Sequence, residues 1–348
     1  MWLISRSDLV FRRRRFVIGV LVTALVFGMA LIFDGVKRAV QNEVPRVVTL
    51  FGADTWVVGT GVTGPFTTTS VFPAEVANQL GDDPGVKRAD PVVLSRGVAR
   101  VDPDKDVNVV GYSPGGLGTP PVDTGRAVRR PGDVVVDETL GLSVGDRLRL
   151  GNATFRVVGV GDQLRYNFGA PTVFMDIADA QKLTFDGQDL AMAVVVRGEP
   201  TRLPRNLATL SNDAVISDLD RITKPGVQTI NMISVLLWIV AIGIIGSIVY
   251  LNALERTRDF AVLKATGSPN RIIVGGLALQ SLFLSIVAAV LAVAVAYLVG
   301  AGLPFPAELE TGSFVQLFGI SILVGLLASL IGARRALTTD PALAFAGA

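Results

Sequence analysis

The chain has 348 residues, half of them hydrophobic, and its mean hydropathy of +0.52 is high for an ordinary soluble protein. It contains no cysteine and no histidine, which excludes disulfides, thiolate nucleophiles, Ser-His-Asp catalytic sites and the usual zinc sites. The net charge is only +2, and the basic residues gather beside apolar runs rather than over a surface suited to nucleic acid. The composition favours a membrane protein and weighs against an enzyme.

The first apolar run follows four arginines at positions 12–15 and predicts a transmembrane helix over 16–34. About 18 uncharged residues reach across a bilayer core. A secretory signal peptide and a twin-arginine export signal are the alternatives, but residues 32–35 offer no convincing cleavage site and no cofactor motif follows. The arginines favour a cytoplasmic N-terminus, an inference that Lys37 and Arg38 weaken without reversing.

Residues 35–228 have the composition of a water-soluble domain, with glycine and proline turns between short strand-like runs. A helical stalk is expected over 36–50, bent or ended by Pro45. Strands are expected at 55–59, 92–101, 107–111, 134–136, 147–150, 154–159, 173–175 and 190–196, and short helices at 73–80 and 177–183. Roughly 190 residues suffice for an independent core, here expected as two subdomains. A polar stretch with three prolines then leads back to the membrane.

Four acidic residues lie close together in the segment 132–146, namely Asp133, Asp137, Glu138 and Asp146. Their spacing lacks the pattern of an EF-hand, and acidic residues are common in turns. We interpret them as turn residues rather than a calcium or magnesium site. Phe168 and Met175 are similarly interpreted as core residues rather than ligand contacts.

Three further apolar runs, 230–254, 272–303 and 313–333, are each long enough to span a bilayer. Basic residues occur in the loop between the second and third spans and directly after the fourth, at Arg256, Arg258, Lys264, Arg271, Arg334 and Arg335. Together with the N-terminal arginines, they collect at the places that four spans put on one side of the membrane. None of the runs carries a charge at mid-depth, unlike the spans of most ion-coupled carriers.

Small residues within two of these runs allow helices to approach closely. They are Gly243, Gly246 and Ser247 in the second span, and Ser321 and Gly325 in the fourth. Packing within one bundle and a dimer seam on the second span are both open interpretations.

The sequence thus predicts an α+β integral membrane protein. Four transmembrane helices carry a large extracytoplasmic mixed α/β domain between helices 1 and 2. In chain order we expect a cytoplasmic N-terminus (1–15), a first span (16–34), the extracytoplasmic domain (35–228), a second span (229–253), a cytoplasmic loop (254–271), a third span (272–300), a short outer loop (301–312), a fourth span (313–333) and a cytoplasmic tail (334–348).

The loop between the second and third spans contains a short charged segment, Glu255 to Gly267. On a helix, Arg256, Phe260 and Leu263 fall on one stripe. Gly267 is expected to end this helix by adopting positive φ, and the Ser-Pro pair after it suits the start of the next helix. Taken alone, the segment is also compatible with an amphipathic helix lying on lipid headgroups.

Three stretches resemble ABC transporter permeases of the FtsX/MacB/LolC type, the mechanotransmission or type VII class. The segment 255–267 is similar to its "ER-x-R-E/D … L-[RK]-A-x-G" signature, and the tail 333–345 to "A-[RK]-R-A … x-x-P-x-x-A-L", apart from Phe345. The run 137–160, "D-E-x-L-G-L-x-V-G-D-x-L-x-L … F-x-V-V-G-V", resembles the extracytoplasmic domain of MacB-type members. The separate-permease members, including actinobacterial FtsX-like permeases, are more similar than MacB itself, whose ATPase is fused at the N-terminus.

The resemblance implies that the charged segment is a coupling helix that docks on a cytoplasmic ABC ATPase. The residues implied are Glu255, Arg256, Arg258, Asp259, Phe260, Leu263, Lys264, Ala265 and Gly267. It also implies a second permease copy, as a homodimer or heterodimer, in the plasma membrane. The sequence has no Gly-x-x-x-x-Gly-Lys-Ser/Thr loop, so we expect ATP and Mg²⁺ to be bound by the partner and no cofactor by this chain.

Two functions from different classes remain at this stage. The chain is either the membrane subunit of an exporter of an amphiphilic or peptide-like substrate, or a mechanical signalling module that regulates a cell-wall hydrolase or sensor without transport. An extracytoplasmic adaptor, a cell-wall enzyme or a substrate-binding protein would be the outer partner. An amino-acid import permease is a weaker alternative, because no polar site lies at mid-membrane.

Overall fold

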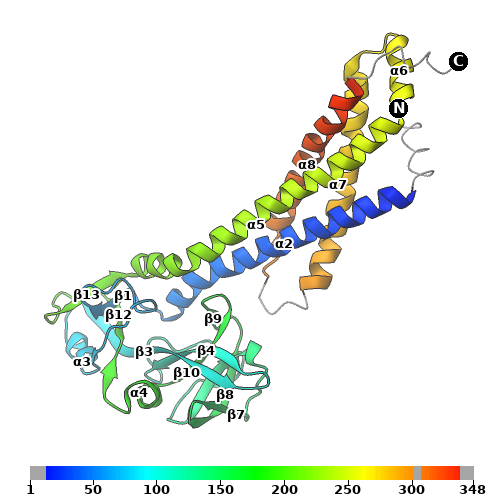
Figure 1. Cartoon of the computed structure of the whole chain (residues 1–348). Coiled ribbons are helices and arrows are strands. Elements are labelled where there is room, and N and C mark those ends of the chain that lie inside the picture. The colour runs from blue at the N-terminus through cyan, green and yellow to red at the C-terminus, as the bar shows by residue number, and fades with distance from the viewer. Residues whose placement is uncertain (1–12, 301–306, 338–348) are drawn as a thin grey trace. The chain divides into compact units, whose positions relative to one another are not determined.

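The computed structural model describes residues 13–300 and 307–337 (Figure 1). These residues form two compact units. One, which we call the membrane unit, comprises the described residues up to Arg38 and those from Gln228 onward; the other, the outer unit, is Ala39–Val227.

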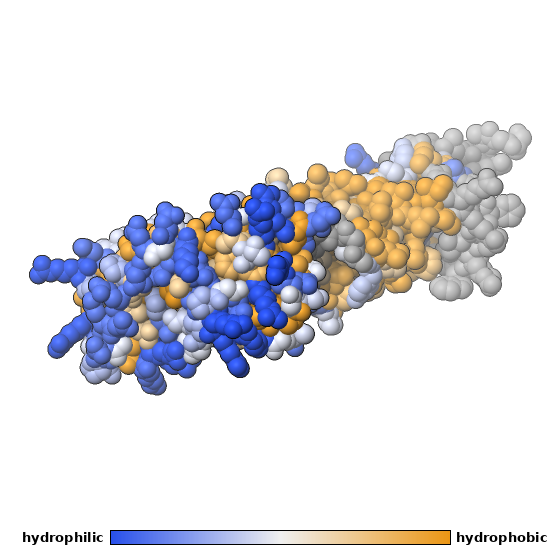
Figure 2. Space-filling view, turned by 90° about the horizontal axis from the view of Figure 1, so that it is seen from below, coloured by the Kyte–Doolittle hydropathy of each residue, from blue (hydrophilic) through white to orange (hydrophobic). Residues whose placement is uncertain are grey.

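Five helices build the membrane unit and the two connections into the outer unit. They are α2 (Arg13–Leu50), α5 (Asn212–Glu255), α6 (Thr257–Ala265), α7 (Asn270–Gly300) and α8 (Thr311–Leu337). Among the described residues, α2, α5, α7 and α8 are long and apolar enough to cross a membrane. Figure 2 shows the hydrophobic surface of these helices and the mostly hydrophilic surface of the outer unit. The predicted fold class, four spans with a large α/β domain between the first two, is confirmed.

Of the two helices that enter the outer unit, α2 confirms the predicted stalk over 36–50: it continues to Leu50, and Pro45 lies inside the helix without ending it. The other helix differs from the prediction. α5 begins at Asn212 rather than in the predicted span, and Pro225 lies inside it. The earlier start of α5 is indicated by a helix N-cap residue followed by apolar residues at helical spacing. Ser211 Oγ accepts a hydrogen bond from the backbone N–H of Ala214 at 3.2 Å, and Val215 and Leu219, one turn apart, are buried.

The outer unit contains a mixed sheet of 11 strands and a separate two-stranded pair. Its strands are β1 (Thr55–Gly59), β2 (Phe72–Pro73), β3 (Val86–Arg100), β4 (Lys105–Tyr112), β5 (Thr124–Gly125), β6 (Asp133–Asp137), β7 (Arg147–Leu150), β8 (Ala153–Gly161), β9 (Arg165–Tyr166), β10 (Ala170–Asp176), β11 (Leu190–Ala191), β12 (Ala193–Gly198) and β13 (Leu207–Ser211). The main order is β13-β1-β12-β3-β4-β10-β6-β8-β5, with β7 beside β3 and β8, β9 beside β10, and β2 paired with β11. Only β4–β10 and β6–β8 are parallel pairs.

Two α-helices and one 3₁₀ turn complete this unit: α3 (Val76–Gly81), α4 (Ile177–Phe185) and η1 (Glu138–Leu140). The helix expected from residue 73 starts later, because Phe72 and Pro73 pair with β11. Asp176 caps α4 by accepting a hydrogen bond from the N–H of Ala178 at 2.9 Å. The long strand β3 pairs with β12 along one edge and with β4 along the other, so a single sheet joins the strands of the outer unit.

An aromatic chain fills one part of the outer core. Ring centroids are 4.8 Å apart for Phe51 and Trp56, 5.6 Å for Trp56 and Phe66, and 5.4 Å for Phe66 and Tyr166. The indole Nε1–H of Trp56 donates to Asn212 Oδ1 at 2.8 Å, which satisfies its polar atom. The start of α5 is therefore tied into the core of the outer unit.

The β9–β10 hairpin is fastened by a buried amide. Asn108 Nδ2 donates to the carbonyl oxygens of Tyr166 and Ala170 at 3.1 and 3.0 Å. The three tip residues between the strands, 167–169, all have positive φ. The tip meets both flanking helices: the N–H of Gly169 donates to Glu43 Oε2 of α2 at 3.2 Å, and the Phe168 ring packs against Gly226 of α5.

In the membrane unit, α7 and α8 approach closely at Gly325. A Cβ atom at this position would lie 2.5 Å from Ser285 Oγ, 3.0 Å from the Cα of Leu282 and 3.2 Å from the carbonyl oxygen of Ser281. Two of these three neighbours are backbone atoms, which cannot turn away as a side chain can. The small residue is therefore a requirement of helix packing within this chain.

We predict that Gly325→Val destabilises the membrane unit by about 1–3 kcal/mol, because added methyl groups must force α7 and α8 apart. Gly319→Val on the same helix is the matched control, since a Cβ there meets nothing within 4 Å. Thermal unfolding of the full chain in nanodiscs measures both. Equal midpoints for the two variants would contradict the packing assignment.

A second prediction concerns Asp83, whose carboxylate accepts hydrogen bonds from the N–H groups of Gly85, Thr201 and Arg202 and from the Thr201 hydroxyl. The bond from Gly85 is the largest cause that lowers the pKa of Asp83 to about 2. Because the folded pKa is below the unfolded value, Asp83 contributes stability above about pH 4, which is lost as the pH falls towards 2.

Asp83→Asn should therefore lower the unfolding midpoint at pH 7, and the difference from the wild type should narrow below pH 4. Denaturation of the full chain followed from pH 7 to pH 2 measures this. A difference that stays constant over that range would contradict the role of the charge.

Candidate functional site

The candidate site is α6, which follows α5 after the single residue Arg256. One face of α6 is buried: Phe260 and Ala261 pack in the core of the membrane unit. The opposite face is exposed and carries Asp259, Val262 and Leu263. Val262 and Leu263 expose 47% and 39% of their surface, so two apolar side chains lie open beside a carboxylate.

This arrangement divides the predicted stripe. Helical spacing alone puts Arg256, Phe260 and Leu263 on one stripe, but Phe260 is buried whereas Leu263 is exposed. The reason is that α6 is a separate helix whose Phe260 lies in the hydrophobic cluster of the membrane unit, and burial of this aromatic residue sets the rotation of the helix. Phe260 thus acts as an anchor, and the surface open to a partner is centred on Leu263.

Polar contacts fix α6 at both ends. Arg256 Nε lies 3.3 Å from Asp259 Oδ2, and its guanidinium lies 6.0 Å from the centre of the Phe260 ring. Lys264 Nζ donates to the carbonyl oxygen of Leu337 at 2.6 Å, near the end of α8. A cation at this point also suits the negative end of the α8 dipole.

Gly267 ends the segment as predicted, with φ of +82°. Its N–H donates to the carbonyl of Lys264, and the N–H of Ser268 donates to that of Leu263, both at 3.0 Å. These two bonds form a Schellman motif, in which glycine avoids the cost of a left-handed Cβ. The candidate residues Glu255, Ala265 and Gly267 are exposed, and of Arg258 only the helical backbone is described.

The small residues of α5 separate into two environments. Gly246 faces α8, where a Cβ would lie 2.4 Å from Cδ1 of Ile331, so it serves packing within the chain. Gly243 and Ser247 are exposed, and a Cβ at Gly243 meets nothing within 4 Å. Gly246 therefore fits packing within one bundle, whereas Gly243 and Ser247 stay open to a dimer seam.

The four acidic residues of segment 132–146 have local contacts. Asp133 lies 2.7 Å from Arg126 Nη2, and Asp137 and Asp146 accept from the N–H groups of Thr139 and Ser143 at 3.0 and 2.8 Å. The nearby carboxylate of Asp162 is the main cause that raises the pKa of Glu138. Among the described residues, no group of three or more His, Cys, Asp or Glu is placed to hold a metal ion.

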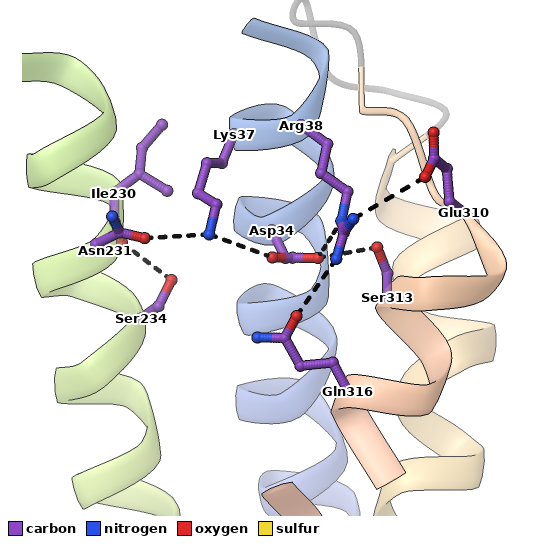
Figure 3. A network of polar contacts seen from close by, with 9 residues as sticks. All are labelled: Asp34, Lys37, Arg38, Ile230, Asn231, Ser234, Glu310, Ser313 and Gln316. Atoms are coloured by element: carbon purple, nitrogen blue, oxygen red, sulfur yellow. Dashed lines mark hydrogen bonds and ion pairs between the residues drawn. The ribbon is translucent and has the colours of Figure 1, made fainter. Parts of the chain in front are cut away.

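A polar cluster that the sequence analysis did not predict lies at the other end of the bundle (Figure 3). Asp34 of α2 is its centre: its Oδ2 accepts from Arg38 Nε at 2.9 Å and from Ser313 Oγ at 2.8 Å. Arg38 also donates to Gln316 of α8 at 3.3 Å, and Lys37 donates to Asn231 of α5 at 3.3 Å. The cluster therefore links α2, α5 and α8.

A backbone hydrogen bond next to the Asp34 cluster joins α2 to the segment before α8. The N–H of Glu308 donates to the carbonyl oxygen of Gly35 at 3.1 Å, and a Cβ at Gly35 would lie 3.1 Å from Leu309. The available signal was the spacing of Asp34 and Arg38, which places opposite charges one helical turn apart. The partners on α5 and α8 are distant in sequence and could not be inferred.

Comparisons with known proteins place these features in a family. Residues 17–208 match the model of the MacB-like periplasmic core domain, and residues 231–341 match that of the FtsX-like permease C-terminal region. A protein of Mycobacterium tuberculosis (strain H37Rv), described as an uncharacterized ABC transporter permease, is 38% identical over 341 residues, covering 98% of both chains. The chain belongs to the FtsX/MacB-type ABC transporter permeases.

A second relative from the same strain, also described as an uncharacterized ABC transporter permease, is 36% identical over 345 residues and covers 98% of both chains. The macrolide export ATP-binding/permease protein MacB of Shewanella oneidensis is 30% identical over 144 residues, which are 40% of this permease and 22% of MacB. The predicted resemblance is thus confirmed, and this is a membrane protein of the ABC transporter permease class. A permease of that class implies an ATPase partner.

Proposed function

We propose that this permease couples ATP hydrolysis by a separate cytoplasmic ABC ATPase to motion of its outer unit, for export or extraction of an amphiphilic or peptide-like substrate. The observation that carries the proposal is the exposed face of α6, with Asp259, Val262 and Leu263 open beside a buried anchor. Apolar residues bordered by charge are typical of the centre of a protein interface. The export role is supported by the similarity to a macrolide export protein.

The proposed orientation puts both termini and α6 in the cytoplasm. Four spans return the chain to its starting side, and α6 lies between the second and third. The arginines at positions 12–15 and the basic residues of the loop 254–271 and of the tail lie on that side, as the positive-inside rule predicts. The outer unit, between the first and second spans, then lies outside the cell membrane.

Chain continuity supplies the proposed route of transmission. α5 starts at Asn212 in the outer unit, runs to Glu255 and is separated from α6 by Arg256 alone. Movement of an ATPase bound to α6 would therefore act directly on the end of a helix that reaches the outer unit. We propose that ATP and Mg²⁺ bind only to the ATPase, that this chain is not catalytic, and that two permease copies assemble with it.

Mechanical signalling without transport is the second candidate. The runs 16–33, 230–254, 272–303 and 313–333 contain no charged residue and so no ionisable site for a small solute, which fits signalling as well as it fits export. Proteins that co-purify with the full permease from its native membrane distinguish the two functions. A cell-wall hydrolase or sensor supports signalling, whereas an adaptor protein supports export.

We predict that Leu263→Asp reduces permease-stimulated ATP hydrolysis at least tenfold, because a carboxylate would be desolvated at the centre of the docking surface. The measurement is the ATPase rate of the partner with the full permease in nanodiscs. Val144→Asp in the outer unit is the matched control, since Val144 is similarly exposed, at 45% against 39%.

The control should insert and stimulate as the wild type does. Full stimulation by a correctly inserted Leu263→Asp variant would contradict docking through α6.

A further inference from the structure

The outer unit contains a pocket of about 300 Å³, at the lower end of the range for small-molecule sites. Its wall comes from the loop after β1, from β3, from the β9–β10 hairpin and from α5. The lining residues are Pro65, Phe66, Thr67, Thr68, Thr69, Leu94, Ser95, Arg96, Tyr166, Met192 and Ile222. Nothing in the coupling role of α6 accounts for a pocket here.

The lining of this pocket includes one cation, Arg96, and several hydroxyl groups. Arg88 and Arg100 of the same strand pair with Asp90 and Asp104, whereas Arg96 takes part in no ion pair among the residues that the structure describes. Burial raises the pKa of Tyr166, and the positive charge of Arg96 opposes this shift. Arg96 lines the pocket together with Thr68 and Thr69, both of which are exposed residues.

The remaining lining residues are mostly apolar. The rings of Phe66 and Tyr166 meet at 5.4 Å, and Leu94 and Met192 are almost fully buried. Ile222 adds a side chain from α5 that stays 39% exposed. A pocket lined by a guanidinium, hydroxyls and apolar side chains suits a molecule with an anionic head and a short hydrocarbon chain.

We propose that this pocket binds a small monoanionic amphiphile, with a carboxylate on Arg96 and the rim threonines and its apolar chain against Phe66, Leu94 and Ile222. The proposal deepens the export function by naming a substrate class. Only the role of the ligand as an exported substrate rests on that function. Binding itself does not depend on the ATPase.

The site is also connected to α5. Asp218, one turn before Ile222, is buried, accepts a hydrogen bond from the Thr67 hydroxyl and packs against Gly64. The loop that forms the rim is therefore fastened to the same helix that lines the wall. A ligand that orders this loop would change the contacts of the helix that leads to α6.

Binding of 6,6,6-trifluorohexanoate to the full permease in nanodiscs, followed by ¹⁹F NMR relaxation with empty nanodiscs as blank, tests the proposal. We expect saturable binding that Arg96→Gln weakens at least tenfold, because a charge-assisted hydrogen bond is lost. Arg100→Gln, on the same strand but outside the pocket, should bind as the wild type does. The uncharged 6,6,6-trifluorohexanol should bind at least tenfold more weakly than the carboxylate.

Arg96→Lys and Ile222→Trp separate charge from shape. The lysine variant should retain much of the affinity, and the tryptophan variant should lose it by filling the pocket. Equal binding by wild type and Arg96→Gln, or no saturable binding above the blank, would overturn the proposal. Either result leaves the ATPase coupling test unaffected, so the two failures are distinguishable.

Discussion

The lack of water in the hydrocarbon core is the constraint on which the membrane unit depends. Each backbone group must bond within its own segment, which leaves helices as the way for this chain to cross. Side-chain hydroxyls obey the same rule: Ser281, fully buried, donates back to the carbonyl of Leu277 at 3.0 Å. Charged groups are consequently confined to the ends, as the Asp34 cluster and as α6.

The two ends use charge differently. At the Asp34 cluster, the charges of Asp34 and Arg38 satisfy one another and link three helices. At α6, burial of Phe260 supplies roughly 1.5–3 kcal/mol and sets which side chains remain outside. That orientation leaves the apolar side chains of Val262 and Leu263 exposed. An apolar surface on a helix beyond the spans is best explained by a partner, and the family implies an ATPase.

The sequence predicted what depends on local pattern. Apolar runs located the spans, short strand-like runs between glycine and proline turns located strands, and Gly267 located the end of α6. Prediction from the sequence failed where contacts between residues far apart in the chain determine the structure. The rotation of α6 follows from packing across the bundle, and α5 tolerates Pro225 because its first turns are held by the outer core. Arg96 carries no local signal, since the pocket is assembled from segments far apart in the chain.

The central claim is that the exposed face of α6 binds the ATPase. A photo-crosslinking amino acid placed at Leu263, in the full permease with its ATPase in nanodiscs, tests it most directly. Met232, exposed at 69% far from α6 along α5, is the control position. The account predicts a covalent adduct with the ATPase from position 263 and none from 232. An ATPase complex that forms without an adduct at 263 would contradict it.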